Sequence, residues 1–329
     1  MNNLLTVKNL STNLSSQRKK IRAVRSVSFD LRPGETLGIV GESGCGKSIM
    51  AKTITRLLPA LTAEIESGKI LYKNEDLLQK SEAEMRSVRG KEISMIFQDP
   101  MTSLNPTMKI GKQIAEGYRS HHPKATNEEV YTRVIELLDQ VVIPEPETRY
   151  KQFPHELSGG MRQRVMIAIA MIAKPQILIA DEPTTALDVT IQAQILELLK
   201  DIQKRENMSI ILITHDFSIV SNFCDRVLVM YAGEVIEVAT IDELFKSPKH
   251  PYTKRLLHSI PHLNSPFDKT LYTIQGSPPD LASTSLGCSF ATRCPHASDR
   301  CRRQKPETLQ IEKDHYVNCW LYNEGESDE

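Results

Sequence analysis

The eight residues from Gly41 to Ser48 have the types and the spacing of a phosphate-binding loop. Their sequence, Gly-Glu-Ser-Gly-Cys-Gly-Lys-Ser, fits the pattern G-x-x-x-x-G-K-[ST] at every fixed position. Glycines let the backbone curl so that successive N–H groups point into one concavity and bind phosphate oxygens. Lys47 supplies a positive charge to the β- and γ-phosphates, and the Ser48 hydroxyl is a ligand for Mg²⁺. The loop predicts binding of a nucleoside triphosphate, with contacts from Gly41, Glu42, Ser43, Gly44, Cys45, Gly46, Lys47, Ser48 and Ile49.

Two acidic residues, Asp181 and Glu182, directly follow the apolar stretch Ile177–Ala180. An acid after a strand, downstream of a phosphate loop, is the residue type that holds Mg²⁺ through water, which fits Asp181. Glu182 beside it is placed to orient or deprotonate an attacking water. Asp-Glu-Pro could also simply close a strand. With the phosphate loop upstream, the pair predicts hydrolysis of the bound nucleotide.

Short strands and helices must position these residues. Thr36–Val40 is an apolar strand directly before the phosphate loop, and Ile49–Leu58 after it is predicted to be a helix that Pro59 stops. The positive N-terminal end of that helix would point at the phosphates. Further strands are predicted at Ile93–Phe97, Ile177–Ala180, Ile210–Thr214 and Val227–Met230.

Helical patterns alternate with these strands. Helices are predicted from Leu157 to about Ala173 and from Ile191 to about Lys204, and residues 99–154 read as helical and irregular. Such alternation favours a mostly parallel sheet with helices on both faces and ligands at the strand ends. Within 99–154, a core-facing stripe at helical spacing is predicted for Val130, Val134, Leu137, Leu138 and Val141.

Leu157-Ser158-Gly159-Gly160-Met161-Arg162-Gln163-Arg164 resembles the signature segment of ATP-binding cassette (ABC) ATPases. It precedes the Ile177–Glu182 segment, as it does in that family. Three further motifs match in order: the glutamine Gln98, the D-loop Ala186-Leu187-Asp188 and the switch histidine His215. With the phosphate loop and Asp181-Glu182, six motifs resemble the family in sequence order.

The resemblance implies a mechanism in which ATP lies between two cassettes arranged head to tail. Ser158, Gly159 and Gly160 would bind the γ-phosphate held by the other subunit. Catalytic roles are implied for Glu182, His215 and Gln98, coupling of the two sites for Asp188, and Mg²⁺ ligation for Ser48, Gln98 and Asp181. One departure is Leu14, which stands where family members usually carry an aromatic residue that stacks on adenine.

The implied fold is an α/β P-loop NTPase with a RecA-like core, an N-terminal antiparallel β subdomain and a helical signature subdomain at about 99–170. A nucleotide-binding domain would span residues 1–240. Residues 241–329 would form a small, irregular, cysteine-rich C-terminal region.

Two segments resemble the ATPases of dipeptide, oligopeptide and nickel importers. One is Phe97–Pro106, and the other is His250–Thr253 followed by Leu256-Leu257 and Ile260-Pro261. The resemblance implies an ATP-hydrolysing subunit that couples ATP binding and hydrolysis to import of dipeptides or oligopeptides. Implied partners are two transmembrane permease subunits, a second homologous ATPase in a heterodimer and, indirectly, an extracellular substrate-binding protein. The alternatives are an importer of nickel or a metal chelate, a soluble ABC protein of DNA repair or translation, and a non-hydrolysing cassette.

Four cysteines, Cys288, Cys294, Cys301 and Cys319, are separated by five, six and seventeen residues. The paired C-x₂₋₄-C knuckles of zinc ribbons are missing, and four thiolates suit a [4Fe–4S] cluster. Some members of the importer subfamily resemble this pattern and carry such a cluster. An iron–sulfur cluster, a zinc ion and free thiols all remain open from the spacing.

The charge balance of the chain bears on its partners and its location. It has 41 basic and 41 acidic residues, whereas a nucleic-acid binder usually shows a basic excess, so no nucleic acid is expected as a partner. The first residues do not resemble a signal peptide, and the apolar run Val165–Ala173 is too short to cross a bilayer. We expect a peripheral protein at the cytoplasmic face of the membrane, held there by the permease subunits.

Overall fold

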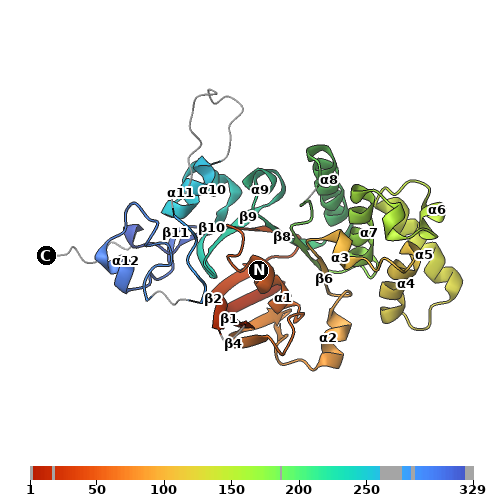
Figure 1. Cartoon of the computed structure of the whole chain (residues 1–329), viewed down its shortest axis with the longest axis horizontal. Coiled ribbons are helices and arrows are strands. Elements are labelled where there is room, and N and C mark those ends of the chain that lie inside the picture. The colour runs from red at the N-terminus through yellow and green to blue at the C-terminus, as the bar shows by residue number, and fades with distance from the viewer. Residues whose placement is uncertain (1–2, 17–18, 186, 260–275, 283–285, 323–329) are drawn as a thin grey trace. The chain divides into compact units, whose positions relative to one another are not determined.

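The computed structural model describes residues 3–16, 19–185, 187–259, 276–282 and 286–322 (Figure 1). Contacts within the chain divide it into two compact units. Unit 1 consists of residues 1–31, 36–78 and 214–329, and unit 2 of residues 32–35 and 79–213.

Unit 1 begins with an antiparallel sheet in the strand order β2-β1-β4-β5. The strands are β1 (Leu5–Ser16), β2 (Lys19–Leu31), β4 (Ala63–Tyr72) and β5 (Glu75–Asp76). Leu5 on β1 lies opposite Leu31 on β2 and Tyr72 on β4, and all three side chains are buried. The alternating apolar residues at the start of the chain therefore form one buried face.

A second set of strands in unit 1 has the order β11-β12-β10-β9-β3. The strands are β3 (Thr36–Val40), β9 (Arg226–Tyr231), β10 (Glu234–Thr240), β11 (Leu309–Glu312) and β12 (His315–Val317). β3 and β9 pair in parallel, and every residue of both is buried, which explains their continuous apolar runs. β10, β12 and β11 add antiparallel strands, so the C-terminal region extends this sheet.

The helices of unit 1 are α1 (Lys47–Ile54), α9 (Phe217–Phe223), α10 (Ile241–Lys246), α11 (Pro251–His258) and α12 (Asp299–Arg303), with the 3₁₀ turn η2 (Trp320–Tyr322). Of these, α9, α10 and α11 contribute buried side chains to the core of the second set of strands. Three aromatic rings stand at the centre of this core. The ring of Tyr231 on β9 lies 4.7 Å from that of Tyr252 on α11 and 5.2 Å from that of Phe290. The C-terminal region therefore packs directly against the strand next to β3.

Helix α1 is shorter than the sequence predicts: it ends at Ile54 and not at Leu58. Arg56 adopts a left-handed conformation with φ of 51°. Its N–H donates to the Thr53 carbonyl, and the N–H of Leu57 donates to the Lys52 carbonyl. This is a Schellman C-cap, which usually carries a glycine at the left-handed position. Because arginine occupies that position here, the sequence shows no stop signal before Pro59.

Unit 2 contains three parallel strands: β6 (Ile93–Ile96), β7 (Ile177–Asp181) and β8 (Ser209–Thr214). Two further helices of this unit are α2 (Glu82–Val88) and α8 (Val189–Glu206). All residues of β7 and β8 are buried. Asp181 ends β7 opposite Ile213 of β8, so β7 delivers the predicted acidic pair at its carboxyl end.

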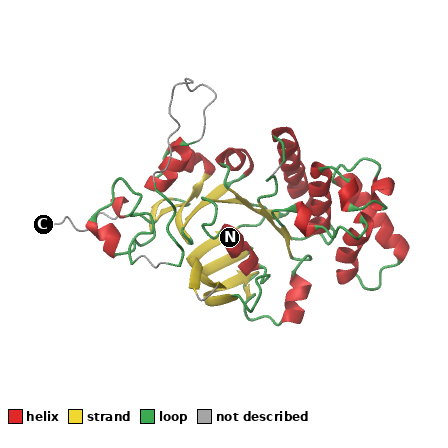
Figure 2. Cartoon of the chain, in the orientation of Figure 1, coloured by secondary structure: helices red, strands yellow, loops and turns green. Residues whose placement is uncertain are grey.

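The chain between β6 and β7 folds into helices and loops (Figure 2). The elements are α3 (Pro100–Ser103), α4 (Ile110–His121), α5 (Asn127–Gln140), α6 (Pro146–Tyr150), the 3₁₀ turn η1 (Pro154–Glu156) and α7 (Gly159–Met171). The predicted stripe at Val130, Val134, Leu137, Leu138 and Val141 is confirmed, since none of these side chains is more than 2% exposed.

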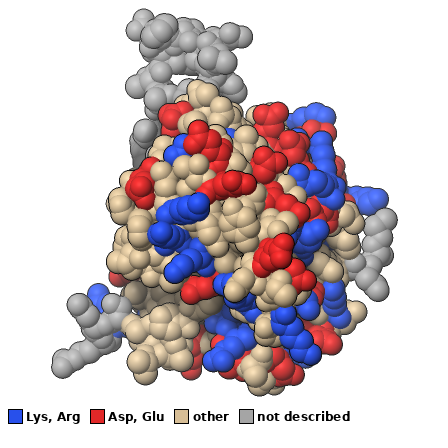
Figure 3. Space-filling model, turned by 90° about the vertical axis from the view of Figure 1, so that its right-hand side faces the viewer, with Lys and Arg blue, Asp and Glu red and all other residues tan. Residues whose placement is uncertain are grey.

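Charge is mixed over the surface: on the face shown in Figure 3, acidic and basic side chains lie interspersed. Among the described residues, none of the helices combines the length and the hydropathy needed to cross a bilayer.

Candidate nucleotide-binding site

The phosphate-binding loop connects β3 to α1 in unit 1. Gly46 has φ of 105°, and a Cβ atom there would lie 2.1 Å from the carbonyl oxygen of Ala23. At Gly41, a Cβ atom would lie 2.3 Å from the carbonyl oxygen of Met230. Only glycine fits at either position, so the loop packs against β2 and β9 without side chains in between.

Lys47 holds its charge inside this loop. The side chain is buried, and Nζ donates to the carbonyl oxygens of Gly41 at 2.7 Å and Glu42 at 3.1 Å. Ser48 follows in the first turn of α1, half-buried. Burial raises the pKa of the Cys45 thiol, so Cys45 acts as a small packing residue of the loop. The loop offers backbone N–H groups, one ammonium and one hydroxyl, which suits a phosphate chain with Mg²⁺.

Three groups hold the loop from outside, and the sequence did not indicate any of them. The backbone N–H of Gly233 donates to the Cys45 carbonyl at 2.8 Å. The hydroxyl of Tyr252 accepts from the N–H of Glu42 at 3.0 Å. Arg293 donates from both terminal nitrogens to the Glu42 carboxylate, at 2.8 and 3.1 Å.

In unit 2, Glu182 lies within a small polar group at the end of β7. Gln98 Nε2 donates to Glu182 Oε2 at 3.1 Å, and the Thr185 hydroxyl donates to the same oxygen at 2.9 Å. Asp181 is only 2% exposed, whereas Glu182 is half-buried and Gln98 is exposed. The structure therefore brings two predicted site residues into contact and adds Thr185, which sequence reasoning missed although it lies only three residues from Glu182.

The predicted signature and D-loop residues both begin helices. Ser158 caps α7, where its side chain accepts from the N–H of Met161 at 3.3 Å, and Gly159 and Gly160 form the first turn. Asp188 caps α8 and accepts from the N–H of Ile191 at 2.9 Å. Ser158, Gly159 and Asp188 are exposed. Ala186 of the D-loop lies outside the described residues.

His215 and Leu14 both belong to unit 1. His215 directly follows β8 and is exposed. Leu14 lies on β1 between Ile21 of β2 and Ala63 of β4, and it is half-exposed.

The four late cysteines line one cavity of about 120 Å³, together with His250 and Trp320. None of the four forms a disulfide with another described cysteine. Burial, and to a smaller extent the neighbouring cysteines, raise the pKa of Cys288 to about 12 and that of Cys319 to about 11. Among the described residues, no group of three or more His, Cys, Asp or Glu side chains is arranged to hold a metal ion.

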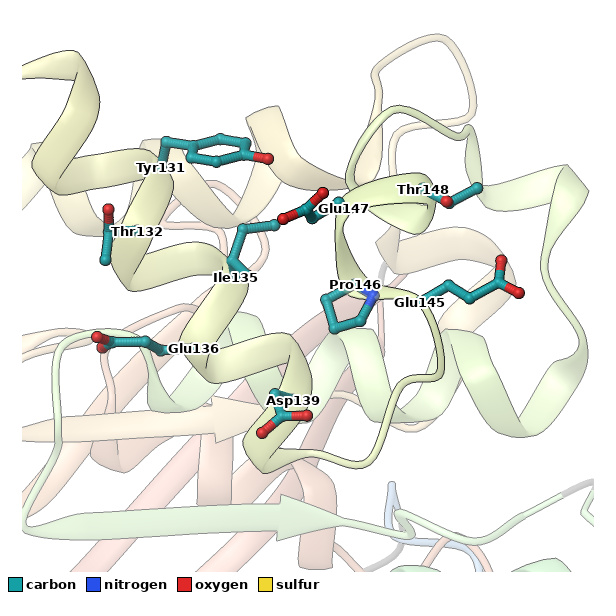
Figure 4. A pocket seen from close by; sticks show the side chains of 9 residues that line it. All are labelled: Tyr131, Thr132, Ile135, Glu136, Asp139, Glu145, Pro146, Glu147 and Thr148. Atoms are coloured by element: carbon teal, nitrogen blue, oxygen red, sulfur yellow. The ribbon is translucent and has the colours of Figure 1, made fainter.

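A larger and more open cavity, of about 710 Å³, lies on α5 and α6 (Figure 4). It contains none of the predicted nucleotide-site residues. Its lining consists of Tyr131, Thr132, Ile135, Glu136, Asp139, Glu145, Pro146, Glu147 and Thr148. Four of these are carboxylates, which disfavour a phosphate ligand, so this cavity is not the nucleotide site.

Sequence relatives match the chain over nearly its whole length. A profile of the ABC transporter family matches residues 24–185, and a profile of the oligopeptide/dipeptide transporter C-terminal region matches residues 236–301. The chain is 53% identical over 318 residues to the oligopeptide transport ATP-binding protein OppD of Bacillus subtilis, covering 97% of this chain and 88% of that protein. It is 51% identical over 324 residues to the dipeptide transport ATP-binding protein DppD of the same organism, covering 98% and 96%.

Solved structures show the same fold. A dimeric ATP-binding cassette in a post-hydrolysis state with ADP and phosphate bound has a TM-score of 0.65 and 27% identity, covering 72% of this chain and 98% of that chain. CbiO1 of Clostridium perfringens, part of the transporter complex cbiONQ, has a TM-score of 0.64 and 29% identity, covering 75% and 92%. Fold and phosphate loop together define an ATPase of the ATP-binding cassette class. Within that class, the chain belongs to the ABC transporter ATP-binding proteins of the oligopeptide/dipeptide group.

Proposed function

We propose that this chain is the ATP-hydrolysing subunit of a membrane importer for dipeptides or oligopeptides. The observation that carries the proposal is the 53% identity to an oligopeptide transport ATP-binding protein over 97% of the chain. This similarity includes the C-terminal region, which a profile of oligopeptide/dipeptide transporters also matches.

In unit 1, the phosphate loop from Gly41 to Ser48 and the following Ile49 would bind the triphosphate. Lys47 is already inside the loop, so its ammonium would exchange two backbone carbonyls for phosphate oxygens. The exposed His215 would donate a hydrogen bond to the γ-phosphate.

In unit 2, Glu182 would act as the general base toward the attacking water. Gln98 and Thr185 hold its carboxylate in place by hydrogen bonds to Oε2. Among the proposed Mg²⁺ ligands, Ser48 of unit 1 offers a hydroxyl, and Gln98 and Asp181 of unit 2 offer an amide oxygen and a buried carboxylate. All three are donor types that Mg²⁺ takes. When bound, Mg²⁺ would neutralise charge on the phosphates.

A second, homologous ATPase subunit would complete each nucleotide site. Ser158, Gly159 and Gly160 stand at the exposed N-terminus of α7, where a helix end presents N–H groups to an anion. They would bind the γ-phosphate held by the partner, and the exposed Asp188 would couple the two sites. ATP binding would close the pair and hydrolysis would open it, which converts the cycle into mechanical work.

We propose two permease subunits as the membrane partners, with an external binding protein acting through them. The chain would be peripheral, at the cytoplasmic face of the membrane, without a nucleic-acid partner. Residues 1–240 would form the nucleotide-binding domain, with a RecA-like core and a helical subdomain at about 99–170, and residues 241–329 the C-terminal region.

We further propose that Cys288, Cys294, Cys301 and Cys319 hold a [4Fe–4S] cluster that stabilises the C-terminal region. Supporting this, all four thiols surround one cavity. The four cysteines lack the paired C-x₂₋₄-C spacing of zinc ribbons, and four thiolates are the ligand set of a [4Fe–4S] cluster.

The cargo is tested by uptake into cells that lack the gene for this chain. We expect wild type to restore uptake of labelled dipeptides or oligopeptides, and Lys47→Ala, made at the same level, to restore none. Radioactive nickel is the second substrate in the same assay. Restoration of nickel uptake without peptide uptake would replace the peptide proposal with the nickel importer.

A further inference from the structure

The C-terminal region holds the phosphate-binding loop through two of its side chains. The guanidinium of Arg293 donates to both oxygens of the Glu42 carboxylate, at 2.8 and 3.1 Å. The hydroxyl of Tyr252 accepts from the backbone N–H of the same residue at 3.0 Å. Glu42 is the second residue of the loop, so one loop position is fixed at both its backbone and its side chain.

Arg293 is itself fixed in place. Its side chain is 5% exposed, and it also donates to the Tyr231 hydroxyl at 3.3 Å. Arg255 on α11 donates to the Arg293 carbonyl at 2.9 Å. Burial opposes the charge of Arg293, but hydrogen bonds to Glu42 and Tyr231 outweigh it and raise the pKa. The guanidinium of Arg293 is planar and permanently charged, so when it is held in this way it fixes the orientation of the Glu42 carboxylate that it binds.

Glu42 needs such a partner because of where it stands. Its carboxylate belongs to the loop that would receive a triphosphate, and an unpaired negative charge there would repel the phosphates. The Glu42 carbonyl also accepts from Lys47 Nζ, so a shift of Glu42 would move the lysine. Pairing with Arg293 removes the net charge and restrains the loop at the same residue.

We propose that Arg293 is a positioning residue for the phosphate-binding loop, and that through it the C-terminal region sets the affinity of the protein for ATP. Arg293 acts through Glu42 and makes no contact with the nucleotide in this account. The inference rests on the proposed function, in which the loop binds ATP.

The test is equilibrium binding of a fluorescent ATP analogue to the full-length protein. We expect Arg293→Met to weaken binding roughly tenfold or more, within the range of coupling between linked sites. Arg293→Lys keeps the charge but loses the bidentate contact with the carboxylate, so its affinity for the analogue should lie between those of wild type and Arg293→Met. The matched control is Arg300→Met in the same segment. Arg300 stacks on Trp320, with its guanidinium carbon 3.8 Å from the ring centroid, so the Arg300→Met protein should bind the analogue with wild-type affinity.

A double-mutant cycle separates positioning of the loop from general damage to the C-terminal region. In the Glu42→Gln background the carboxylate charge is gone, so Arg293→Met should weaken binding much less than it does in wild type. In the assembled transporter, Arg293→Met should raise the KM for ATP with little change in kcat, since the catalytic residues are untouched.

Three results would overturn the inference. Wild-type affinity in Arg293→Met would show that the pair only anchors the C-terminal region. If Arg293→Met weakened binding equally in the wild-type and Glu42→Gln backgrounds, its effect on affinity would not depend on the contact with Glu42. Absence of ATP binding by the wild-type protein would contradict the proposed function, and this inference with it.

Discussion

Glu182 adopts a backbone conformation that non-glycine residues rarely take, with φ of 47°. Strain of this kind persists where the surrounding structure holds it, and it concentrates at functional sites. Here the N–H of Glu182 donates to the Ile213 carbonyl at 2.9 Å, and Gln98 and Thr185 fix its carboxylate. The residue is thus held at the end of β7 by contacts at its backbone and its side chain.

This geometry predicts the outcome of Glu182→Gln. The amide has the same shape but is a far weaker base, so ATP turnover in the assembled complex should fall by at least about 10²-fold while ATP binding is retained. Glu206→Gln, a surface change on the same unit, is the control and should leave turnover as in wild type. If the assembled Glu182→Gln complex hydrolysed ATP at half the native rate, Glu182 could not be the general base.

Single residues differ in how far the sequence alone could place them. The residues of the phosphate loop, the acidic pair and the helix caps follow local patterns, so their positions are predictable from spacing. Arg293 and Tyr252 lie 251 and 210 residues from Glu42. No periodicity links residues so far apart. Tyr252 lies in the His250–Thr253 segment that resembles importer ATPases, but that resemblance indicated no contact with Glu42, and Arg293 matched no motif. They could be found only once the C-terminal region was seen to pack on β9.

Among the elements, helix α11 depends on the protonation state of its cap. His250 is buried, and its Nδ1 accepts from the N–H of Tyr252 at 3.1 Å, which requires the unprotonated ring nitrogen. Burial lowers the pKa of His250 to about 4 despite the nearby Glu237. The unfolded chain therefore binds a proton more readily than the folded one between about pH 6.5 and 4.

From this we expect stability to fall as the pH drops through that window. The stabilisation is fully present above about pH 6.5, and on the order of 2 kcal/mol should be lost by about pH 5. Urea unfolding at pH 7 and pH 5 measures this. His250→Asn keeps a capping acceptor but does not titrate, so it should lose less stability over the same range. Equal losses in the two proteins would rule out His250 as the source.

The C-terminal region permits a test of whether its four cysteines hold the proposed cluster. Any single change among Cys288, Cys294, Cys301 and Cys319 to serine should weaken the proposed [4Fe–4S] cluster, because serine is a poorer ligand than a thiolate for this soft metal site. Protein purified without oxygen should contain about four irons per chain and be brown. In the serine variants, limited proteolysis should cut the C-terminal region first. Stoichiometric zinc without iron would replace the cluster with a zinc site, and neither metal would leave free thiols.

The molecule as a whole carries its predicted catalytic groups on two compact units. The phosphate loop and His215 belong to unit 1, and Gln98, Asp181, Glu182 and the signature residues belong to unit 2. The parallel strands β3–β9 and β6–β7–β8 follow from short continuous apolar runs that alternate with helical patterns, as the sequence predicts. The C-terminal strands β11 and β12 were not predicted, because they are only four and three residues long and carry little apolar pattern.

A second cassette should be needed for rapid turnover. The residues Ser158–Gly160 would face a partner's nucleotide, so the purified chain alone should bind ATP yet hydrolyse it slowly. Specific activity should rise when the homologous partner is added. Rapid turnover that is independent of protein concentration, in a proven monomer, would contradict this arrangement.

The central claim is that this chain hydrolyses ATP to drive peptide import. It is tested most directly by reconstituting the chain with its permease subunits, second ATPase and binding protein in liposomes. ATP on the side of this chain should drive accumulation of labelled peptide inside the compartment that holds the ATP. Lys47→Ala and Glu182→Gln should each abolish accumulation. Peptide accumulation that continues undiminished in both variants would contradict the account.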